Sequence, residues 1–428
     1  MTRNNINKFK SYKGYGPFAF TPQEDKLRYN EGNLISTHDD PTFSLDRTGI
    51  PITPRHEPCG YWYKDPSSGI PATLYNVYAV GENGQFQLGD DGQVNRNEFT
   101  IAIDPVVQQA VSWGNFSWIL DKNGFVWAWG VNADYQCTDD DVSEVHVPSK
   151  RTDRPAFTVI AACANGVMGV TSSGLCYYAG DNVSGTSGFG YTSANVRNTD
   201  GKVPITNIIG CGGGADDLAG VSFLIDINNK LYAAGNGNFW QLGLGDQVDR
   251  DVHTHVPVTQ SPIKKIECGL YHTVLLYENG EMWVIGRNNR GQCGVGNFDA
   301  YITTWTQIPG SWLNMSCNNA RHTVAVKNDG TLWATGYGGE GQLGQDSTDD
   351  INIFTQIGVA TNWTEVATGH DFTVALNSAK EMWGTGANHK GNLGVGDWDD
   401  KLVLTKATVD GWDKVVAGKW FVLALREK

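Results

Sequence analysis

Residues 336–344 read G-Y-G-G-E-G-Q-L-G, and residues 386–394 read G-A-N-H-K-G-N-L-G. Each stretch begins three positions after a tryptophan and ends in a second glycine. The pattern occurs in seven copies, about fifty residues apart, and such a period is typical of radial or solenoid repeat proteins. The first glycines of the copies are Gly81, Gly130, Gly180, Gly235, Gly286, Gly336 and Gly386.

A second half-motif precedes most copies. Residues 266–276 read I-E-C-G-L-Y-H-T-V-L-L, and residues 366–376 read V-A-T-G-H-D-F-T-V-A-L. Short runs of alternating or β-branched residues, broken by glycine and polar turns, are typical of antiparallel strands. Four such strands per copy predict one blade of a β-propeller.

The two ends of the repeat region complement each other. Residues 77–89 carry the second half of the motif without the first, and residues 415–425 carry the first half without the second. Joined, they complete a seventh blade, and this closure removes the free sheet edges of an open array. The sequence therefore predicts an all-β protein: a seven-bladed β-propeller over residues 71–428, closed by both termini, with an extended N-terminal arm over residues 1–70.

The motifs C-G-x-x-H-T, W-x-x-G and G-Q-L-G together resemble the repeat of the regulator of chromosome condensation (RCC1-like) family. The resemblance covers residues 75–428. It implies a seven-bladed propeller. Members of the family include an exchange factor for the Ran GTPase, a plant UV-B photoreceptor and bacterial β-lactamase inhibitors, so the resemblance implies a fold without implying one activity.

Composition argues against several classes of partner. The formal net charge is −14 and the pI is near 5.0, which opposes binding to a phosphate backbone. No apolar run reaches the length of a membrane span, and residues 1–14 lack the apolar centre of a signal peptide. We expect no nucleic-acid or membrane partner, and synthesis in the cytoplasm.

The cysteines recur at equivalent places in different copies, which predicts small buried side chains rather than disulfides. Only Cys59 lies outside the repeats. The others are Cys137, Cys163, Cys176, Cys211, Cys268, Cys293 and Cys317.

The histidines offer candidates for catalysis or metal binding. His272, His322 and His370 stand at or near the H-T position, and their recurrence favours one structural hydrogen bond within each blade over a catalytic base. His253 and His255 have the spacing of two ligands on one strand face, but no third ligand is near them in the sequence. No phosphate loop or nucleophile elbow is present. We expect no enzyme activity, no cofactor and no metal site.

Aspartates follow the second glycine in nearly every copy and should gather into an acidic rim. Two explanations stay open: aspartate forms turns and keeps loops soluble, or the rim docks a basic partner. Whether one of these loops binds a cation also stays open. The rim residues are Asp90, Asp91, Asp139, Asp140, Asp141, Asp246, Asp249, Asp251, Asp299, Asp346, Asp349, Asp350, Asp397, Asp399 and Asp400.

One copy carries an insertion, C-G-G-G-A-D-D-L-A-G-V-S-F-L at residues 211–224, which predicts a flexible acidic bulge. Asp216 and Asp217 in this insertion are candidate partner-binding residues. So are Asp397, Trp398 and Asp399 in the last loop of the rim.

The first seventy residues differ from the repeats. Basic and aromatic side chains are interspersed there without a strand or helix period. We expect an arm that fastens to its own propeller or to a neighbouring subunit. The candidate contact residues of the arm are Arg3, Lys8, Phe9, Lys10, Tyr12, Lys13, Tyr15, Phe18 and Phe20.

Two hypotheses for function follow. Because propellers of this repeat resemble ones found among the structural proteins of tailed bacteriophages, the first is a non-enzymatic virion component at a tail, collar or capsid surface. Other protein subunits of an oligomeric or mixed assembly would be its partners. The alternative is a soluble regulatory propeller that binds one partner protein, as an exchange factor or an inhibitor does.

Overall fold

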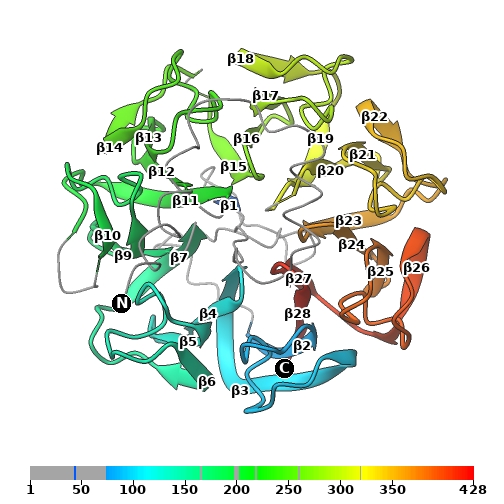
Figure 1. Ribbon diagram of the computed structural model, residues 1–428, viewed down its shortest axis with the longest axis horizontal. Helices are drawn as coiled ribbons and strands as arrows, with labels where there is room; N and C mark the ends of the chain where they lie inside the picture. Colours follow the sequence, from blue (N-terminus) through cyan, green and yellow to red (C-terminus); the bar gives the residue numbers. More distant parts are fainter. Residues whose placement is uncertain are drawn as a thin grey trace, which may run out of the picture. The chain divides into compact units, whose positions relative to one another are not determined.

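The computed structural model describes residues 43–44, 74–163, 166–196, 202–216, 219–258, 261–318 and 320–428. These residues form strands, turns and loops, and none of them lies in a helix long and apolar enough to span a membrane. The strands make antiparallel sheets that are arranged around a common centre (Figure 1). We number the blades 1 to 7 in chain order.

Blades 1 and 2 share one long strand. The 18 residues of β3 pair first with β2 and then with β4, so the two blades appear as one seven-stranded sheet. Blade 1 contains β27 (Lys414–Ala417), β28 (Phe421–Glu427), β2 (Tyr75–Gly81) and the first part of β3 (Arg96–Trp113). Blade 2 contains the second part of β3 with β4 (Phe116–Asp121), β5 (Val126–Val131) and β6 (Glu144–Lys150).

The other five blades each contain four consecutive strands. Blade 3 contains β7 (Phe157–Cys163), β8 (Gly166–Thr171), β9 (Cys176–Asn182) and β10 (Ser193–Val196). Blade 4 contains β11 (Ile208–Asp216), β12 (Ala219–Asp226), β13 (Leu231–Gly235) and β14 (Arg250–His255). Blade 5 contains β15 (Ile263–Cys268), β16 (His272–Tyr277), β17 (Met282–Arg287) and β18 (Tyr301–Ile308). Blade 6 contains β19 (Trp312–Ser316), β20 (His322–Lys327), β21 (Leu332–Gly336) and β22 (Ile351–Gln356). Blade 7 contains β23 (Trp363–Thr368), β24 (Phe372–Asn377), β25 (Glu381–Gly386) and β26 (Lys401–Asp410). A short strand, β1 (Phe43–Ser44), pairs with the inner edge of β15.

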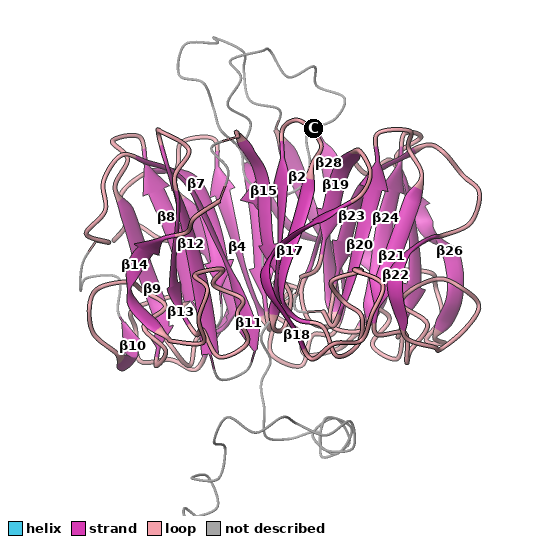
Figure 2. Ribbon diagram, turned by 90° about the horizontal axis from the view of Figure 1, so that it is seen from above, coloured by secondary structure: helices cyan, strands magenta, loops and turns pink. Residues whose placement is uncertain are grey.

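The ring is closed. β2 from the first repeat pairs along its whole length with β28 from the last, with Val77 opposite Leu425. Inner strands of neighbouring blades also contact each other around the ring, including β27 of blade 1 and the β3 strand that leads into blade 2. Figure 2 shows the strands side by side with loops at both ends. The predicted seven-bladed propeller and its closure by both termini are confirmed.

The core lies between the blades. Every residue of β16 is buried, because both of its faces are covered by neighbouring sheets, whereas the outer strand β18 is mostly half-buried or exposed. Cys137, Cys293 and Leu343 fill the same buried slot in three blades. As predicted, the seven cysteines in the described residues are free and buried. Cys59 lies outside them.

Two further predictions concern the insertion and the N-terminal arm. The insertion at residues 211–224 is not a bulge, because its residues lengthen β11 and β12 into a regular hairpin in which Gly212 pairs with Phe223 and Asp216 with Ala219. Asp217 lies outside the described residues. So do the arm candidates Arg3, Lys8, Phe9, Lys10, Tyr12, Lys13, Tyr15, Phe18 and Phe20, and the fastening role of the arm stays a prediction.

Candidate partner-binding face

One end of the ring is built from the loops that carry the repeat motifs. The loop between the first and second strands of each blade emerges there, together with the loop between the third and fourth strands, and we call this end the motif face. Its inner loops are hydrogen-bonded to one another from blade to blade. The Leu270 amide donates to the Ala320 carbonyl at 3.1 Å, and the His370 amide donates to the Lys419 carbonyl at 3.2 Å.

Beneath the motif face, two recurring histidines join neighbouring blades. Nε2 of His272 lies 2.9 Å from the Thr323 hydroxyl of the next blade, and Nε2 of His322 lies 2.9 Å from the Thr373 hydroxyl. The predicted hydrogen bond therefore exists between blades rather than within one. Burial lowers the pKa of both imidazoles to about 3, so they are neutral at physiological pH and serve as structural groups.

His370 belongs to a different cluster. Phe372 occupies the register position of His322 in its blade, and His370 lies two residues earlier, in the loop. Its Nδ1 is 2.8 Å from the buried Asp371 carboxylate, and its ring stacks on Trp420 from the next blade. Burial raises the pKa of Asp371 to about 8. The cluster fastens blade 7 to blade 1.

An arginine and two aromatic rings form a compact cluster on blades 4 and 5 of the motif face. The guanidinium carbon of Arg287 lies 4.8 Å from the Tyr271 ring centroid and 5.5 Å from that of Phe239. The two rings are 4.4 Å apart. Arg287 is 6% exposed, and no ion pair joins it to a carboxylate among the described residues. Two cation–π contacts thus hold this nearly buried cation in place at the motif face.

A second cluster lies on blade 6. Two guanidinium groups flank the Tyr337 ring, with Arg321 at 4.3 Å and Arg290 at 5.2 Å from its centroid. Arg290 forms an ion pair of 3.0 Å with Asp350, and Arg321 lies 3.8 Å from Asp371. Blades 5 and 6 therefore place three guanidinium groups among aromatic rings on one arc of the motif face.

The opposite arc of the motif face has carboxylates. Asp134 of blade 2 lies in the loop between the third and fourth strands, and Asp181 of blade 3 lies near the end of the third strand, β9. Burial raises the pKa of Asp134 to about 6 and that of Asp181 to about 7. Blades 2 and 3 thus carry carboxylates that burial makes easier to protonate, whereas blades 5 and 6 carry the three guanidinium groups, two of them near carboxylates.

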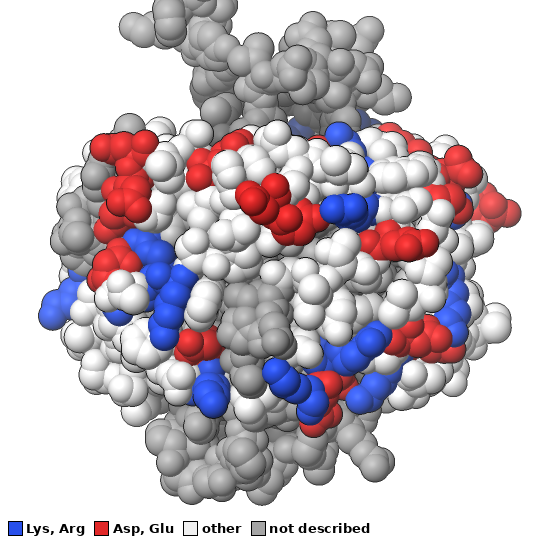
Figure 3. Space-filling view, turned by 90° about the horizontal axis from the view of Figure 1, so that it is seen from below, with Lys and Arg blue, Asp and Glu red and all other residues white. Residues whose placement is uncertain are grey.

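The aspartates of the predicted rim hold their own turns. Asp350 accepts a hydrogen bond from the Gly338 amide, Asp400 from the Asn388 amide and Asp249 from the Gly237 amide. These contacts favour the turn-forming explanation. Figure 3 shows acidic and basic side chains interspersed on one side of the protein.

The candidates in the last rim loop lie at the surface. Asp397 accepts hydrogen bonds from Asn388 and Lys401, so much of its capacity is used locally. Trp398 is 45% exposed, and Asp399 is exposed. Their role in binding stays a prediction, as does that of Asp216.

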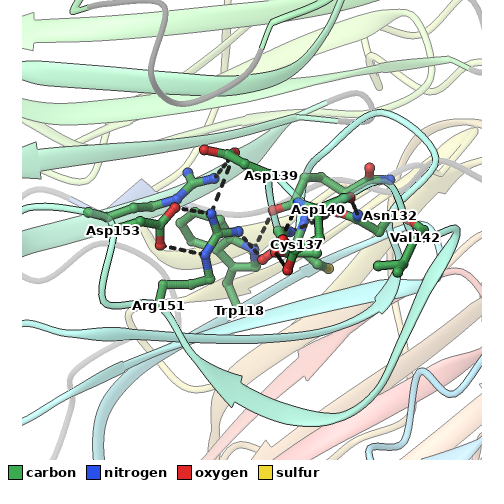
Figure 4. A network of polar contacts seen from close by, with 11 residues as sticks. Trp118, Asn132, Cys137, Asp139, Asp140, Val142, Arg151 and Asp153 are labelled. Atoms are coloured by element: carbon green, nitrogen blue, oxygen red, sulfur yellow. Dashed lines mark hydrogen bonds and ion pairs between the residues drawn. The ribbon is translucent and has the colours of Figure 1, made fainter.

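Blade 2 contains a buried polar network that the repeat motif does not predict (Figure 4). Arg151 donates to the Cys137 carbonyl and to Asp153, and Arg154 lies 3.6 Å from Asp139 and stacks over Trp118. Burial and the neighbouring Arg151 lower the pKa of Arg154 to about 9. The position of Arg151 is apolar in other blades: Val203, Val256 and Ile357 make the same backbone hydrogen bond.

The two histidines that have the spacing of metal ligands, His253 and His255, differ in burial. Nε2 of His253 lies 2.9 Å from the Ser222 hydroxyl in the interior, whereas His255 is exposed. Among the described residues no group of three or more potential ligands is placed to hold a metal ion.

The cluster around Arg287 was not predicted, because its members come from separate segments of two blades. Phe239 lies in a loop of blade 4, Tyr271 in a loop of blade 5, and Arg287 at the end of strand β17. A non-motif arginine directly after a repeat glycine was the available signal. The contact of Arg321 with the Tyr337 ring was not predicted either.

The fold and its site define a closed β-propeller of RCC1-type repeats. Models of the regulator of chromosome condensation (RCC1) repeat match residues 228–276, 329–376 and 263–292. These matches show RCC1-type repeats at those residues, as the motifs predicted.

Relatives and solved structures agree with this assignment. The chain is 24% identical to protein pim1 of Schizosaccharomyces pombe over 254 residues, which are 53% of this chain and 46% of pim1. It is 27% identical to the human X-linked retinitis pigmentosa GTPase regulator over 52% of this chain and 22% of that protein. The structure of Prp20p from Saccharomyces cerevisiae has a TM-score of 0.73 at 20% identity, covering 83% of this chain and 92% of Prp20p. The chain spans less than half the length of these two curated relatives.

Proposed function

We propose that this protein is a non-enzymatic regulatory propeller that binds a partner protein through its motif face. The observation that carries the proposal is the cluster of Arg287, Tyr271 and Phe239. A nearly buried guanidinium packed against two aromatic rings at the motif face, without a carboxylate of the described residues beside it, is suited to contact with a partner protein.

The relatives support this reading. One is named as a GTPase regulator, and the Prp20p structure is described together with the binding of that protein to Gsp1p and histones. A relative named as a probable E3 ubiquitin-protein ligase, HERC3, matches over only 15% of its own length, so its activity is not inferred for this chain. These names fit the regulatory alternative better than a virion component, whose argument rested on the arm and on a resemblance.

The chemistry of the interior also supports a binding role. The recurring histidines are buried, neutral and engaged with threonines, which makes them unsuited to proton transfer at a surface. The His370–Asp371 pair is packed between blades under Trp420. Propellers of this kind present many loops on a rigid ring, which suits recognition of a folded protein.

Affinity capture with paired variants tests the proposal. The wild-type protein, an Arg287→Gln/Arg290→Gln variant and a Lys122→Gln/Lys230→Gln variant are used as baits in an extract of the source cells. Lys122 and Lys230 are exposed in turns at the opposite end of the ring. We expect a protein that the wild type and the lysine variant retain and the arginine variant loses. Equal retention by all three baits contradicts the proposal.

A further inference from the structure

The further inference rests on the proposed function and concerns the chemistry of the partner. We propose that blades 5 and 6 of the motif face bind an acidic segment of a partner protein, with Arg287 as the main carboxylate-binding group and Arg290 and Arg321 beside it.

The backbone fixes Arg287. Its amide donates to the Tyr271 carbonyl at 2.9 Å, and its own carbonyl accepts a contact from the Cys293 thiol. The preceding Gly286 has a φ of 112°, and an added Cβ would lie 2.5 Å from the Tyr271 carbonyl oxygen. A glycine is therefore required for the close approach that brings the guanidinium beside the Tyr271 ring.

The second cluster lies on the adjacent blade. The Leu270 amide donates to the Ala320 carbonyl, so the loops that carry Tyr271 and Arg321 run next to each other. Arg290 lies in the loop that follows Arg287 and reaches across to Tyr337 and Asp350 of blade 6. An extended segment that crosses from blade 5 to blade 6 therefore meets Arg287 first and then Arg290 and Arg321.

Stacked guanidinium groups suit carboxylates. An arginine that stacks on rings keeps its N–H groups in the plane, where they can donate two parallel hydrogen bonds to one carboxylate. The rings also reduce its motion, which lowers the entropy lost on binding. Tyrosine and phenylalanine beside the cations add apolar contact for the stems of glutamate or for neighbouring side chains.

The net charge distinguishes a protein segment from a nucleic acid. The chain has a formal net charge of −14 and therefore repels a long polyanion, because the field of the whole protein acts on many phosphates at once. A short segment with a few carboxylates meets mainly the local field around Arg287, since Arg290 pairs with Asp350 and Arg321 lies near Asp371. The acidic protein segment is thus the occupant that the charge distribution favours.

Fluorescence anisotropy with defined probes tests the inference. The probes are a short glutamate-rich peptide, the same peptide with glutamines, and a single-stranded oligonucleotide of equal length. We expect the glutamate peptide to bind at least about tenfold more tightly than the glutamine peptide, with binding weakened by salt. Arg287→Gln should remove about tenfold of the affinity, Arg287→Lys should remove part of it because lysine lacks the planar fork, and Lys230→Gln should leave it unchanged.

Each alternative gives a distinct result. Equal affinity for the two peptides overturns the inference, and so does tighter binding of the oligonucleotide. Light scattering that shows a dimer of the wild type and a monomer of Arg287→Gln overturns it in favour of a second copy. Thermal unfolding of each variant confirms that the fold is intact. If peptide preference is absent but capture still depends on the arginines, the proposed function stands and this inference fails.

Discussion

The hydroxyl of Thr323 is shared between blades: it lies 2.9 Å from Nε2 of His272 and donates to the Gln292 carbonyl at 2.7 Å. His272 and Gln292 belong to blade 5, and Thr323 belongs to blade 6. The same arrangement recurs one blade further, where Thr373 contacts His322 and the Gln342 carbonyl. The H-T and G-Q motifs are thus two halves of one connection between blades.

This connection makes stability depend on pH. The pKa of His272 is about 3 in the folded protein and near 6.5 when unfolded, so the unfolded chain binds more protons between these values. Stability is fully present above about pH 6.5 and is lost as the pH falls toward about 3. At about pH 5, the contribution of His272 should be reduced by about 2 kcal/mol relative to about pH 7.

Urea unfolding of the wild type and of His272→Phe at the two pH values measures this difference. Phenylalanine occupies the equivalent register position in blades 7 and 1, as Phe372 and Phe421. We expect the variant to lose less stability than the wild type on acidification. An identical pH dependence of the two proteins would show that His272 does not carry the effect.

The buried arginines of blade 2 lead us to expect a larger effect of one substitution than of another. Asp139 lies within 3.6 Å of both Arg151 and Arg154, so Asp139→Asn leaves two neighbouring buried cations with less compensation. Because Asp139 is partly exposed, we expect a loss of about 2 kcal/mol rather than the full cost of breaking a buried pair.

Arg151→Val replaces a buried ion by the residue type found at the same position in blades 3 and 4, Val203 and Val256. It also removes the like charge beside Arg154. We expect a change within about 1 kcal/mol, and we expect this substitution to reduce the cost of Asp139→Asn in the double variant. Additive losses in chemical denaturation would contradict a coupled network.

Gly286 and Gly84 provide a matched pair for the role of the repeat glycine. Gly286 has a positive φ and lacks room for a Cβ, whereas a Cβ at Gly84 would meet nothing within 4 Å. Gly286→Ala should cost about 2–4 kcal/mol and weaken binding at Arg287, and Gly84→Ala should be neutral. Denaturation midpoints of the two variants measure the contrast, and similar midpoints would refute it.

Much of the fold could be predicted because the repeat encodes it in every copy. The period sets the blades, and the incomplete first and last copies specify that β2 pairs with β28. The extended hairpin at Gly212 and Asp216 was missed because glycine and aspartate disfavour strands in isolation, and pairing with β12 overrides this preference.

The candidate site was much less predictable. A periodic signal describes what the copies share, whereas a site depends on how single copies differ. Arg287 departs from the motif at one position, and its partner Phe239 lies in another blade. The direction of the histidine bonds was missed for the same reason, since sequence spacing cannot distinguish a contact within a blade from one to its neighbour.

The outer strands suggest a last prediction about solubility. The hydroxyl of Thr355 donates to the Ile353 carbonyl two residues before it, on the outermost strand of blade 6. This bond occupies an acceptor on a sheet edge that could otherwise pair with another chain. The same bond occurs from Ser149 to Val147, Thr254 to Val252, Thr306 to Thr304 and Thr405 to Val403.

Replacing the threonines at positions 254, 306, 355 and 405 with valine should free these edge acceptors. It should also raise the β propensity of the outer strands. We expect the folded protein to keep its unfolding midpoint but to self-associate at lower concentration, as light scattering over a concentration series would show. Thr303→Val is the control. Thr303 is exposed on the outer strand β18, and its replacement by valine puts a methyl group in place of the hydroxyl without freeing one of these carbonyls. If the control associates as strongly as the fourfold variant, added apolar surface explains the effect and the hydroxyl bonds do not protect the edge.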